Sequence, residues 1–285
     1  MKPSILNRDR KWYVTALYVV FLLGASFSFL LPLIYMITTA FKEATQVAAY
    51  PPRWLPNPWS LRAFREVWET GLYVNFAKNT VFITAVNVIG VLLSCTLVAF
   101  GFACLNAKGK PFLFGMLLAT MMIPGTVTLI PMFQLYARIR WVDTYLPLTI
   151  TAFMGGGAFN IFLLRQFFAS IPKSLTESAR LDGCGWLRVC FQIFVPNAKP
   201  ALLVITIFSF VNCWNDYFGP LIYLTTPSKY TLAIGINLFK NQYGGAMDAG
   251  PMMAMATLSV LPVLILYIIC QKYFVQGVVT TGMKM

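Results

Sequence analysis

Residues 177–196, ESARLDGCGWLRVCFQIFVP, form a polar segment in a chain that is otherwise mostly apolar. Ser174 and Glu177 have the spacing of a capping box, and Gly183 stands where a left-handed residue commonly ends a helix. The pattern predicts a short helix over residues 175–182, lying outside the membrane. The alternative is that the segment is only a connector, in which Glu177 caps the helix and Gly183 turns the chain. A connector, however, would not need a segment of this length.

Composition places the chain in a bilayer. Hydrophobic residues make up 58% of the sequence, charged residues only 11%, and the mean hydropathy is +0.70. A water-soluble domain of 285 residues could not bury this much apolar surface. The net charge of +13 is scattered through connecting segments and forms no continuous basic stripe, which argues against nucleic acid as a partner.

Six apolar stretches are each long enough to cross the roughly 30 Å hydrocarbon core of a membrane, which takes about 20 helical residues. They predict an all-α integral membrane protein with six transmembrane helices, folded as a single domain over residues 1–285 with a polar loop at 167–197. Pro124, followed by Gly125, predicts a kink in the third span, because proline removes a backbone donor and clashes with the preceding turn. The expected spans lie near residues 13–39, 74–104, 112–136, 144–166, 198–223 and 251–275.

The distribution of basic residues predicts the orientation of these spans, because Lys and Arg in short loops resist translocation. Most of the 22 basic residues fall on the side of the two termini and the polar loop, with only Asp9, Glu177 and Asp182 of the 9 acidic residues. Both termini and the polar loop are therefore expected on the cytoplasmic side of the cell membrane. The basic residues on that side are Lys2, Arg8, Arg10, Lys11, Lys108, Lys110, Arg165, Lys173, Arg180, Arg188, Lys199, Lys272 and Lys284.

The chain shows no sign of a cofactor, metal or nucleotide site of its own. It contains no His, and its six Cys form neither a CxxC pair nor a ligand spacing typical of metal sites. A P-loop is also absent, since the nearest match, Gly109-Lys110, is followed by Pro111. Without His residues or a cluster of carboxylates within the spans, a membrane-embedded enzyme is disfavoured.

The polar segment resembles the EAA loop of binding-protein-dependent ABC importers, through which a permease subunit docks onto its ATPase subunit. Ser178 stands where that pattern usually has Ala, and Cys184 where Ala is common after the Gly. Over nearly its full length the chain is also similar to the carbohydrate-uptake permeases of the maltose type, second-subunit kind. The matching stretches are FLLPLIYMITTAFK, IPGTVTLIPMFQLY, IFLLRQFFASIPKSLTESARLDG, WNDYFGPLIYL and QKYFVQGVVTTGMKM.

The resemblance implies a type I ABC importer permease fold and a set of partners. These are a homologous second permease, two ATP-binding cassette subunits that hold ATP and Mg, and an extracytoplasmic solute-binding protein. In such permeases the short helix is a coupling helix, so Glu177 would pair with a basic residue of the ATPase, Ala179 would pack in its cleft and Gly183 would permit the turn. The ATPase-docking residues that follow are Glu177, Ser178, Ala179, Asp182 and Gly183.

A sugar or oligosaccharide is the solute that the resemblance implies. A polyol or glycerol-phosphate-type solute is the alternative cargo, and a stand-alone secondary carrier is the alternative mechanism. The near absence of carboxylates within the spans argues against the carrier, which usually needs them for ion coupling. Asp216 is the exception, and either caps a helix end or lies on the solute path.

Polar and aromatic side chains within the spans are the candidates for the solute path, because sugars are bound by hydrogen bonds and ring stacking. They are Asn87, Asn160, Asn212, Trp214 and Asn215, each of which could instead bridge helices. The resemblance also implies that the loop NQYGGAMDAG reaches toward the binding protein, and an ordinary exposed loop is the alternative. Its expected contact residues are Gln242, Tyr243, Gly244, Gly245 and Asp248.

Overall fold

The computed structural model describes residues 12–242 and 248–282. Every regular element in these two ranges is a helix, and no strand occurs in them. The prediction of an all-α protein is therefore confirmed. A bilayer explains this choice, because a helix satisfies its own backbone hydrogen bonds where no water is available.

Four helical stretches of the described chain are long and apolar enough to cross a membrane, and the number rises to six if each of two bent pairs forms one span. The four are Tyr13–Ala40 of α1 (Trp12–Ala40), α4 (Leu72–Cys104), Leu146–Ala169 and Gly250–Gln271 of α15 (Gly250–Gly282). The stretch Leu146–Ala169 contains α7 (Leu146–Thr149), the 3-10 helix η1 (Ile150–Phe153) and α8 (Ala158–Ala169).

The two bent pairs break where proline restricts the backbone. In the first, α5 (Lys110–Thr120) and α6 (Gly125–Arg138) meet at 96°, and Pro124 precedes the first residue of α6. The break lies at the predicted kink but is much sharper than a bend within one helix. In the second, the helical run Trp186–Asn197 meets α12 (Lys199–Trp214) at 84°, with Pro200 in the first turn of α12.

The fifth expected span, residues 198–223, is not one helix. Helix α12 ends at Trp214, and α13 (Phe218–Tyr223) follows as a separate short helix. The Asp216 carboxylate accepts a hydrogen bond from the Gly219 backbone N–H at 3.1 Å. Asp216 thereby satisfies a free donor at the start of α13, which stabilises the break.

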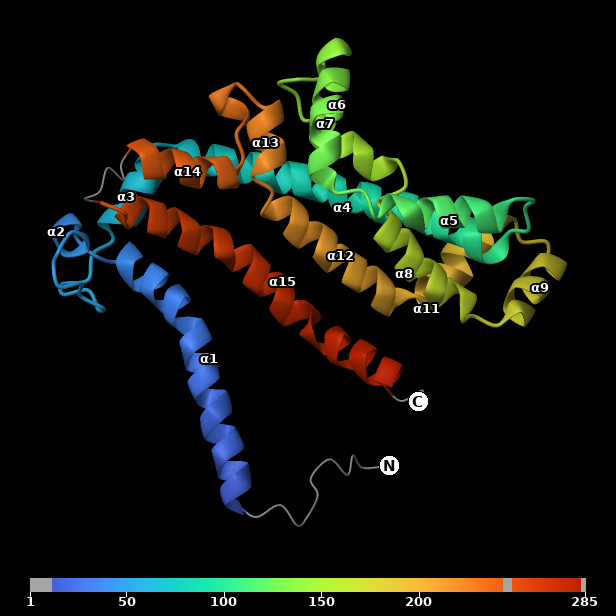
Figure 1. Ribbon diagram of the computed structural model, residues 1–285, viewed down its shortest axis with the longest axis horizontal. Coiled ribbons are helices and arrows are strands. Elements are labelled where there is room, and N and C mark those ends of the chain that lie inside the picture. Colours follow the sequence, from blue (N-terminus) through green and yellow to red (C-terminus); the bar gives the residue numbers. More distant parts are fainter. Residues whose placement is uncertain (1–11, 243–247, 283–285) are drawn as a thin grey trace. The chain divides into compact units, whose positions relative to one another are not determined.

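The chain groups into two compact units, residues 1–70 with 239–258 and residues 71–238 with 259–285. In the second unit α4 is the central helix, and it contacts α7, η1, α8 and α12 (Figure 1). Its core includes an aromatic cluster in which Phe100 and Phe168 lie 5.1 and 5.3 Å from the ring of Phe194, both edge to face. This geometry is the one that aromatic rings prefer.

A close approach between α4 and the segment 150–157 organises this unit. A Cβ at Gly90 would lie 2.7 Å from the Phe153 ring, and one at Gly156 would lie 2.8 Å from the carbonyl oxygen of Val91. Gly156 also has φ +69°, a conformation that favours glycine. The Ser94 hydroxyl donates to the Ala152 carbonyl at 2.6 Å, which locks the two segments together.

The first unit contains α1, α2 (Ala44–Val47) and α3 (Arg62–Glu69), and its ionic centre is the guanidinium of Arg62. Arg62 pairs with Asp248 at 2.6 Å, with Glu66 one turn later and with Glu43 at 3.7 Å. The Asp248 carboxylate also accepts from the Gly250 backbone N–H at 3.0 Å, at the start of α15. Arg62 therefore joins α3 to the residues that begin α15.

A latch around Asp143 joins two connecting loops of the second unit. One carboxylate oxygen accepts from the backbone N–H groups of Thr225 and Thr226, both at 3.0 Å. The other accepts from the Thr226 hydroxyl at 2.6 Å and from the Lys229 ammonium at 2.8 Å. These hydrogen bonds hold the pKa of Asp143 well below its usual range, and the bond from Lys229 makes the largest contribution.

Gly156→Ala is expected to destabilise the second unit by roughly 1–3 kcal/mol, because the added methyl group meets the α4 backbone and strains a left-handed residue. Thermal unfolding of the purified protein measures this loss. Gly101→Ala is the matched control, since a Cβ at Gly101 has no neighbour within 4 Å and Gly101 lies inside α4. Equal melting temperatures for the two variants would contradict the close-packing argument.

Asp143→Asn is expected to lower the melting temperature at pH 7, because the amide loses the charge that pairs with Lys229. Folding lowers the pKa of Asp143, so its stabilising effect is present above the unfolded-state pKa of about 3.9 and is lost as the pH falls below that value. Melting curves from pH 7 to pH 3 measure the difference between wild type and variant. A difference that stays constant across this range would show that the charge of Asp143 does not stabilise the latch.

Candidate functional site

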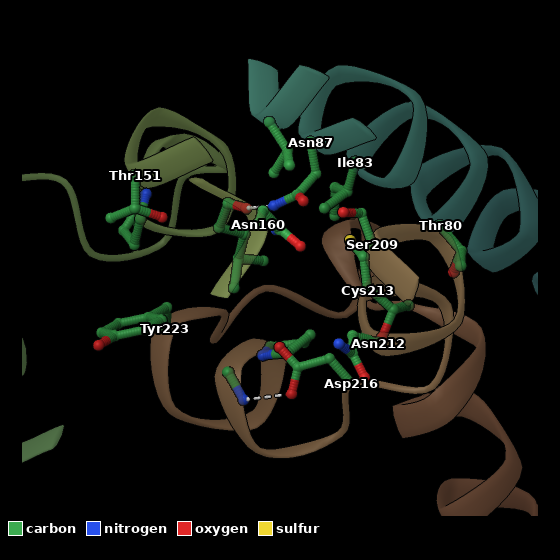
Figure 2. Close-up of a pocket in the computed structure, with 16 residues that line it drawn as sticks. Thr80, Ile83, Asn87, Thr151, Asn160, Ser209, Asn212, Cys213, Asp216 and Tyr223 are labelled. Atoms are coloured by element: carbon green, nitrogen blue, oxygen red, sulfur yellow. Dashed lines mark hydrogen bonds between the residues drawn. The ribbon is translucent and has the colours of Figure 1, made fainter. Parts of the chain in front are cut away.

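A cavity of about 470 Å³, with both polar and apolar lining residues, lies within the second unit, among α4, the α7–η1 segment, α8, α12 and α13. Its size falls in the range of small-molecule sites. In Figure 2 the side chains of Asn87, Asn160, Asn212 and Asp216 converge on a common space. The lining residues are Thr80, Ile83, Asn87, Val91, Pro147, Leu148, Thr151, Asn160, Ser209, Asn212, Cys213, Asp216, Gly219, Pro220, Tyr223 and Thr231.

Helical periodicity explains why these side chains meet. The α4 residues recur every three or four positions, from Thr80 through Asn87 to Val91, so they share one helix face. Ser209 and Asn212 of α12 follow the same rule. This face of α12 packs against α4 and leaves the cavity between their polar groups.

The cavity amides are held in place by the backbone while keeping an acceptor free. The Asn87 amide N–H₂ donates to the Leu148 carbonyl at 3.2 Å, and that of Asn160 donates to the Gly156 carbonyl at 2.7 Å. Each side-chain oxygen remains available to a hydroxyl donor. Asn212 makes no side-chain hydrogen bond to any residue that the structure describes.

The structure brings three of the five expected path residues together and separates the other two. Asn87, Asn160 and Asn212 line the cavity, whereas Trp214 and Asn215 do not. The Trp214 indole N–H donates to the Ser259 carbonyl of α15 at 3.0 Å, and its ring stacks on Phe210. Trp214 thus bridges helices, which is the alternative role considered from the sequence.

Sequence reasoning missed part of the lining. Ser209 and Thr80 were not candidates, although each lies three or seven positions from an expected asparagine on the same helix face. Thr231 carried no such signal, because it precedes α14 (Leu232–Gln242) and reaches the cavity only through the fold. Asp216 accepts a hydrogen bond at the start of α13, which is the helix-end role considered for it, and it also lines the cavity. Its place on the solute path stays a prediction.

The second candidate site is the polar segment, whose helix α9 spans Lys173–Leu181. The capping-box prediction is wrong, because Pro172 precedes the helix, Ser174 lies inside it and no side chain caps its first turn. At the other end, Gly183 has φ +81° and donates to the Arg180 carbonyl, while the Cys184 N–H donates to the Ala179 carbonyl. These two bonds form a Schellman motif, so Gly183 ends the helix as predicted.

One face of α9 is buried and the other is open. Ala179 is 9% exposed and belongs to the hydrophobic core of its own chain. The expectation that Ala179 packs in the cleft of another subunit does not fit this placement. Glu177, Ser178, Asp182 and Gly183 are exposed, and Leu181 is 88% exposed.

The exposed face of α9 carries Glu177 without an ion-pair partner, and the end of the helix is held by contacts of Arg180. Glu177 forms no ion pair with any residue in the described ranges. The guanidinium of Arg180 lies 4.7 Å from the centre of the Trp186 ring and donates to the Cys184 carbonyl at 2.8 Å. Helix α10 (Trp186–Val189) continues into the core through Val189, which is 1% exposed.

The expected binding-protein contacts fall mostly outside the described structure. Tyr243, Gly244 and Gly245 lie outside the described residues, as does the side chain of Gln242. Asp248 is described, and its carboxylate is engaged by Arg62 and Gly250. No group of His, Cys, Asp and Glu suited to a metal ion occurs within the described part of the chain.

Residues 90–280 match the family described as binding-protein-dependent transport system inner membrane component. The arabinooligosaccharides transport system permease protein AraQ of Halalkalibacterium halodurans is 30% identical over 256 residues, covering 89% of this chain and 90% of that protein. The polygalacturonan/rhamnogalacturonan transport system permease protein YtcP of Bacillus subtilis is 27% identical, covering 93% of this chain and 96% of that protein.

Two solved structures are similar to the chain. One belongs to a bacterial ABC transporter involved in the import of the acidic polysaccharide alginate, with 26% identity and a TM-score of 0.83 over 93% of this chain and 98% of that one. The other, from the alginate transporter in complex with an alginate pentasaccharide-bound periplasmic protein, has a TM-score of 0.60 at 15% identity over 93% and 96% of the two chains, a likeness of fold. With its spans, its polar segment and a family match over residues 90–280, the chain belongs to the inner membrane components of binding-protein-dependent transport systems.

Proposed function

We propose that this chain is the second permease subunit of an ATP-driven importer that carries a carbohydrate across the cell membrane. It is not the ATPase itself, and two separate ATP-binding cassette subunits bind ATP and Mg at its cytoplasmic face. A homologous second permease completes the translocation path, and an extracytoplasmic protein delivers the solute. The single observation that carries this proposal is that α9 has an exposed face while Ala179 anchors the helix in the hydrophobic core. It gains weight because the chain belongs to the family of binding-protein-dependent transport components.

Helix α9 is proposed as the element through which the ATPases act. Glu177, Ser178, Asp182 and Gly183 remain in the proposed docking surface, and Leu181 joins them because its side chain is 88% exposed. Ala179 instead anchors the helix from below, since it packs into the chain's own core. An anchored helix transmits a push from its outer face into the core, because close-packed interiors are not freely deformable.

The orientation follows from the distribution of charge. The polar segment and both termini share the side that holds most of the 22 basic residues, which is the expected cytoplasmic side. The loop at 242–248 then lies on the outer side, where Gln242, Tyr243, Gly244 and Gly245 are proposed to face the solute-binding protein. Asp248 does not present a free carboxylate there, because it pairs with Arg62.

A carbohydrate is supported by two kinds of observation. Relatives covering about nine-tenths of the chain are named for arabinooligosaccharides and for polygalacturonan/rhamnogalacturonan. The cavity offers amide and hydroxyl groups, including Asn87, Asn160 and Asn212, which match the hydroxyl groups of a sugar. A polyol or glycerol-phosphate-type solute is the second candidate, because a polyol presents the same hydroxyl groups.

Glu177→Lys is expected to leave membrane insertion intact and to reduce uptake and solute-stimulated ATP hydrolysis roughly tenfold or more, because like charges at an interface repel. Both rates, uptake and ATP hydrolysis, are measured with the complex reconstituted in vesicles together with its binding protein. Glu69→Lys is the matched control, since Glu69 is also exposed but lies at the end of α3, on the expected outer side. Normal transport by the Glu177→Lys complex would rule out coupling through this residue.

Leu181→Ala is expected to weaken ATPase binding roughly tenfold to a hundredfold, which corresponds to the loss of about 1.5–3 kcal/mol when a buried leucine contact is removed. Titration of purified ATPase onto the permease pair in detergent measures the affinity. Leu55→Ala is the control, since Leu55 is 67% exposed in the first unit. If wild-type permease purified without any ATPase and still concentrated solute in vesicles, the chain would be a secondary carrier.

A further inference from the structure

The charge of the cavity lining bears on a question that the family leaves open. Relatives and structural neighbours include proteins named for arabinooligosaccharides and one for an acidic polysaccharide, so membership does not decide between neutral and acidic solutes. Among the sixteen described residues that line the cavity, Asp216 is the only one with a charged side chain, and none is Lys or Arg. This chain therefore presents one carboxylate and no cationic side chain to a solute in the cavity.

No basic side chain of the described residues pairs with the Asp216 carboxylate. No ion pair engages Asp216 within the described chain, and the Gly219 backbone N–H donates a hydrogen bond to its carboxylate. With that bond at 3.1 Å, the carboxylate still has lone pairs that can accept further hydrogen bonds. Proteins that bind carboxylates or phosphates supply Arg or Lys for the purpose, and this lining supplies neither.

Several other lining residues can form hydrogen bonds with the hydroxyl groups of a solute. Asn87 and Asn160 each keep a free amide oxygen at a fixed position, and Asn212 keeps its whole amide. Thr231 is only 4% exposed, and its buried hydroxyl has no hydrogen-bond partner within the described structure. A buried hydroxyl without a partner is costly, and a ligand that bonds to it removes the cost.

We propose that this cavity takes an uncharged, hydroxyl-rich solute, a neutral sugar or polyol, and that Asp216 rejects acidic glycans and phosphate esters. The carboxylate accepts hydrogen bonds from solute hydroxyls and repels a second anion at close range. This inference rests on the proposed function and narrows its solute class. It also removes the glycerol-phosphate type of cargo from consideration while keeping a free polyol.

Cys213 supplies a reporter inside the cavity, because its thiol belongs to the lining and is partly exposed. The test uses the purified complex of permease pair and ATPases, in nucleotide-free and ATP-bound states. The cationic thiol reagent MTSET and the anionic reagent MTSES are applied in parallel, and the modification rate is read from the Cys213 peptide by mass spectrometry. This readout requires neither ATP hydrolysis nor transport, so it is independent of the Glu177 experiment.

Each rate is divided by the rate of the same reagent with a small free thiol, because a thiolate intrinsically reacts faster with the cationic reagent. The normalised rate at Cys213 is expected to be about tenfold higher for the cationic reagent, as a nearby carboxylate at intermediate dielectric produces. Asp216→Asn is expected to bring the two rates within about twofold, because it removes the charge and keeps an acceptor for the Gly219 N–H. Glu69→Gln is the matched control, since it removes an exposed carboxylate that does not line the cavity and lies outside the proposed docking surface. A rate ratio that Asp216→Asn leaves unchanged would overturn the proposal, as would a Cys213 that neither reagent reaches.

Ligand class is tested by protection from labelling. Arabinotriose is expected to slow modification of Cys213 in the wild-type complex, and trigalacturonate at the same concentration is not. With Asp216→Asn, trigalacturonate is expected to protect as well. Equal protection of the wild type by both trisaccharides, or protection by neither, would contradict a neutral hydroxyl-rich occupant even if Glu177→Lys behaves as expected. Melting temperatures of each variant show whether a change in labelling reflects the cavity or the fold.

Discussion

The close contact between α4 and the segment 150–157 is the constraint on which the second unit depends. Gly90 and Gly156 lack the methyl group that would hold these backbones apart, and Ser94 adds a hydrogen bond to Ala152 across the contact. The contact fixes Gly156, whose carbonyl in turn positions the amide of Asn160. The cavity lining is therefore set by backbone packing rather than by side chains that could rotate independently.

The sequence was sufficient to predict features that depend on local physics. The apolar composition predicted helices throughout, and Gly183 correctly marked the end of α9 because left-handed residues are a local property. Pro124 likewise marked the break before α6. Ser174 failed as a cap because α9 begins at Lys173, directly after Pro172, which is two residues earlier than predicted.

Features that depend on which helices pack together were less accessible. Asn87 and Asn212 were found because each is a polar residue within an apolar stretch, whereas Thr231 lies next to them only after folding. The resemblance implied that Ala179 packs in the cleft of another subunit, whereas in the structure this small side chain packs into the core of its own chain. Trp214 looked like a sugar platform, yet its indole N–H is engaged by Ser259.

The docking surface and the cavity share one segment of chain. Helix α9 leads through α10, the π-helix η2 (Cys190–Phe194) and α11 (Val195–Asn197) into α12, which carries Ser209 and Asn212. Phe194 holds this path in the aromatic cluster with Phe100 and Phe168. The proposed energy input and the proposed solute site are thus joined by one stretch of chain, which turns at Gly183 after α9 and bends by 84° before α12.

The Asp143 latch limits how the cavity can change its width. Asp143 lies just before α7, and its partners Thr225 and Thr226 follow α13, so the latch ties together two helices that supply Pro147, Leu148, Pro220 and Tyr223 to the lining. The latch clamps these two walls together at one end. While it holds, a wider cavity would require displacement of α4, α8 or α12, the helices that carry the cavity asparagines, relative to the proline-bearing walls.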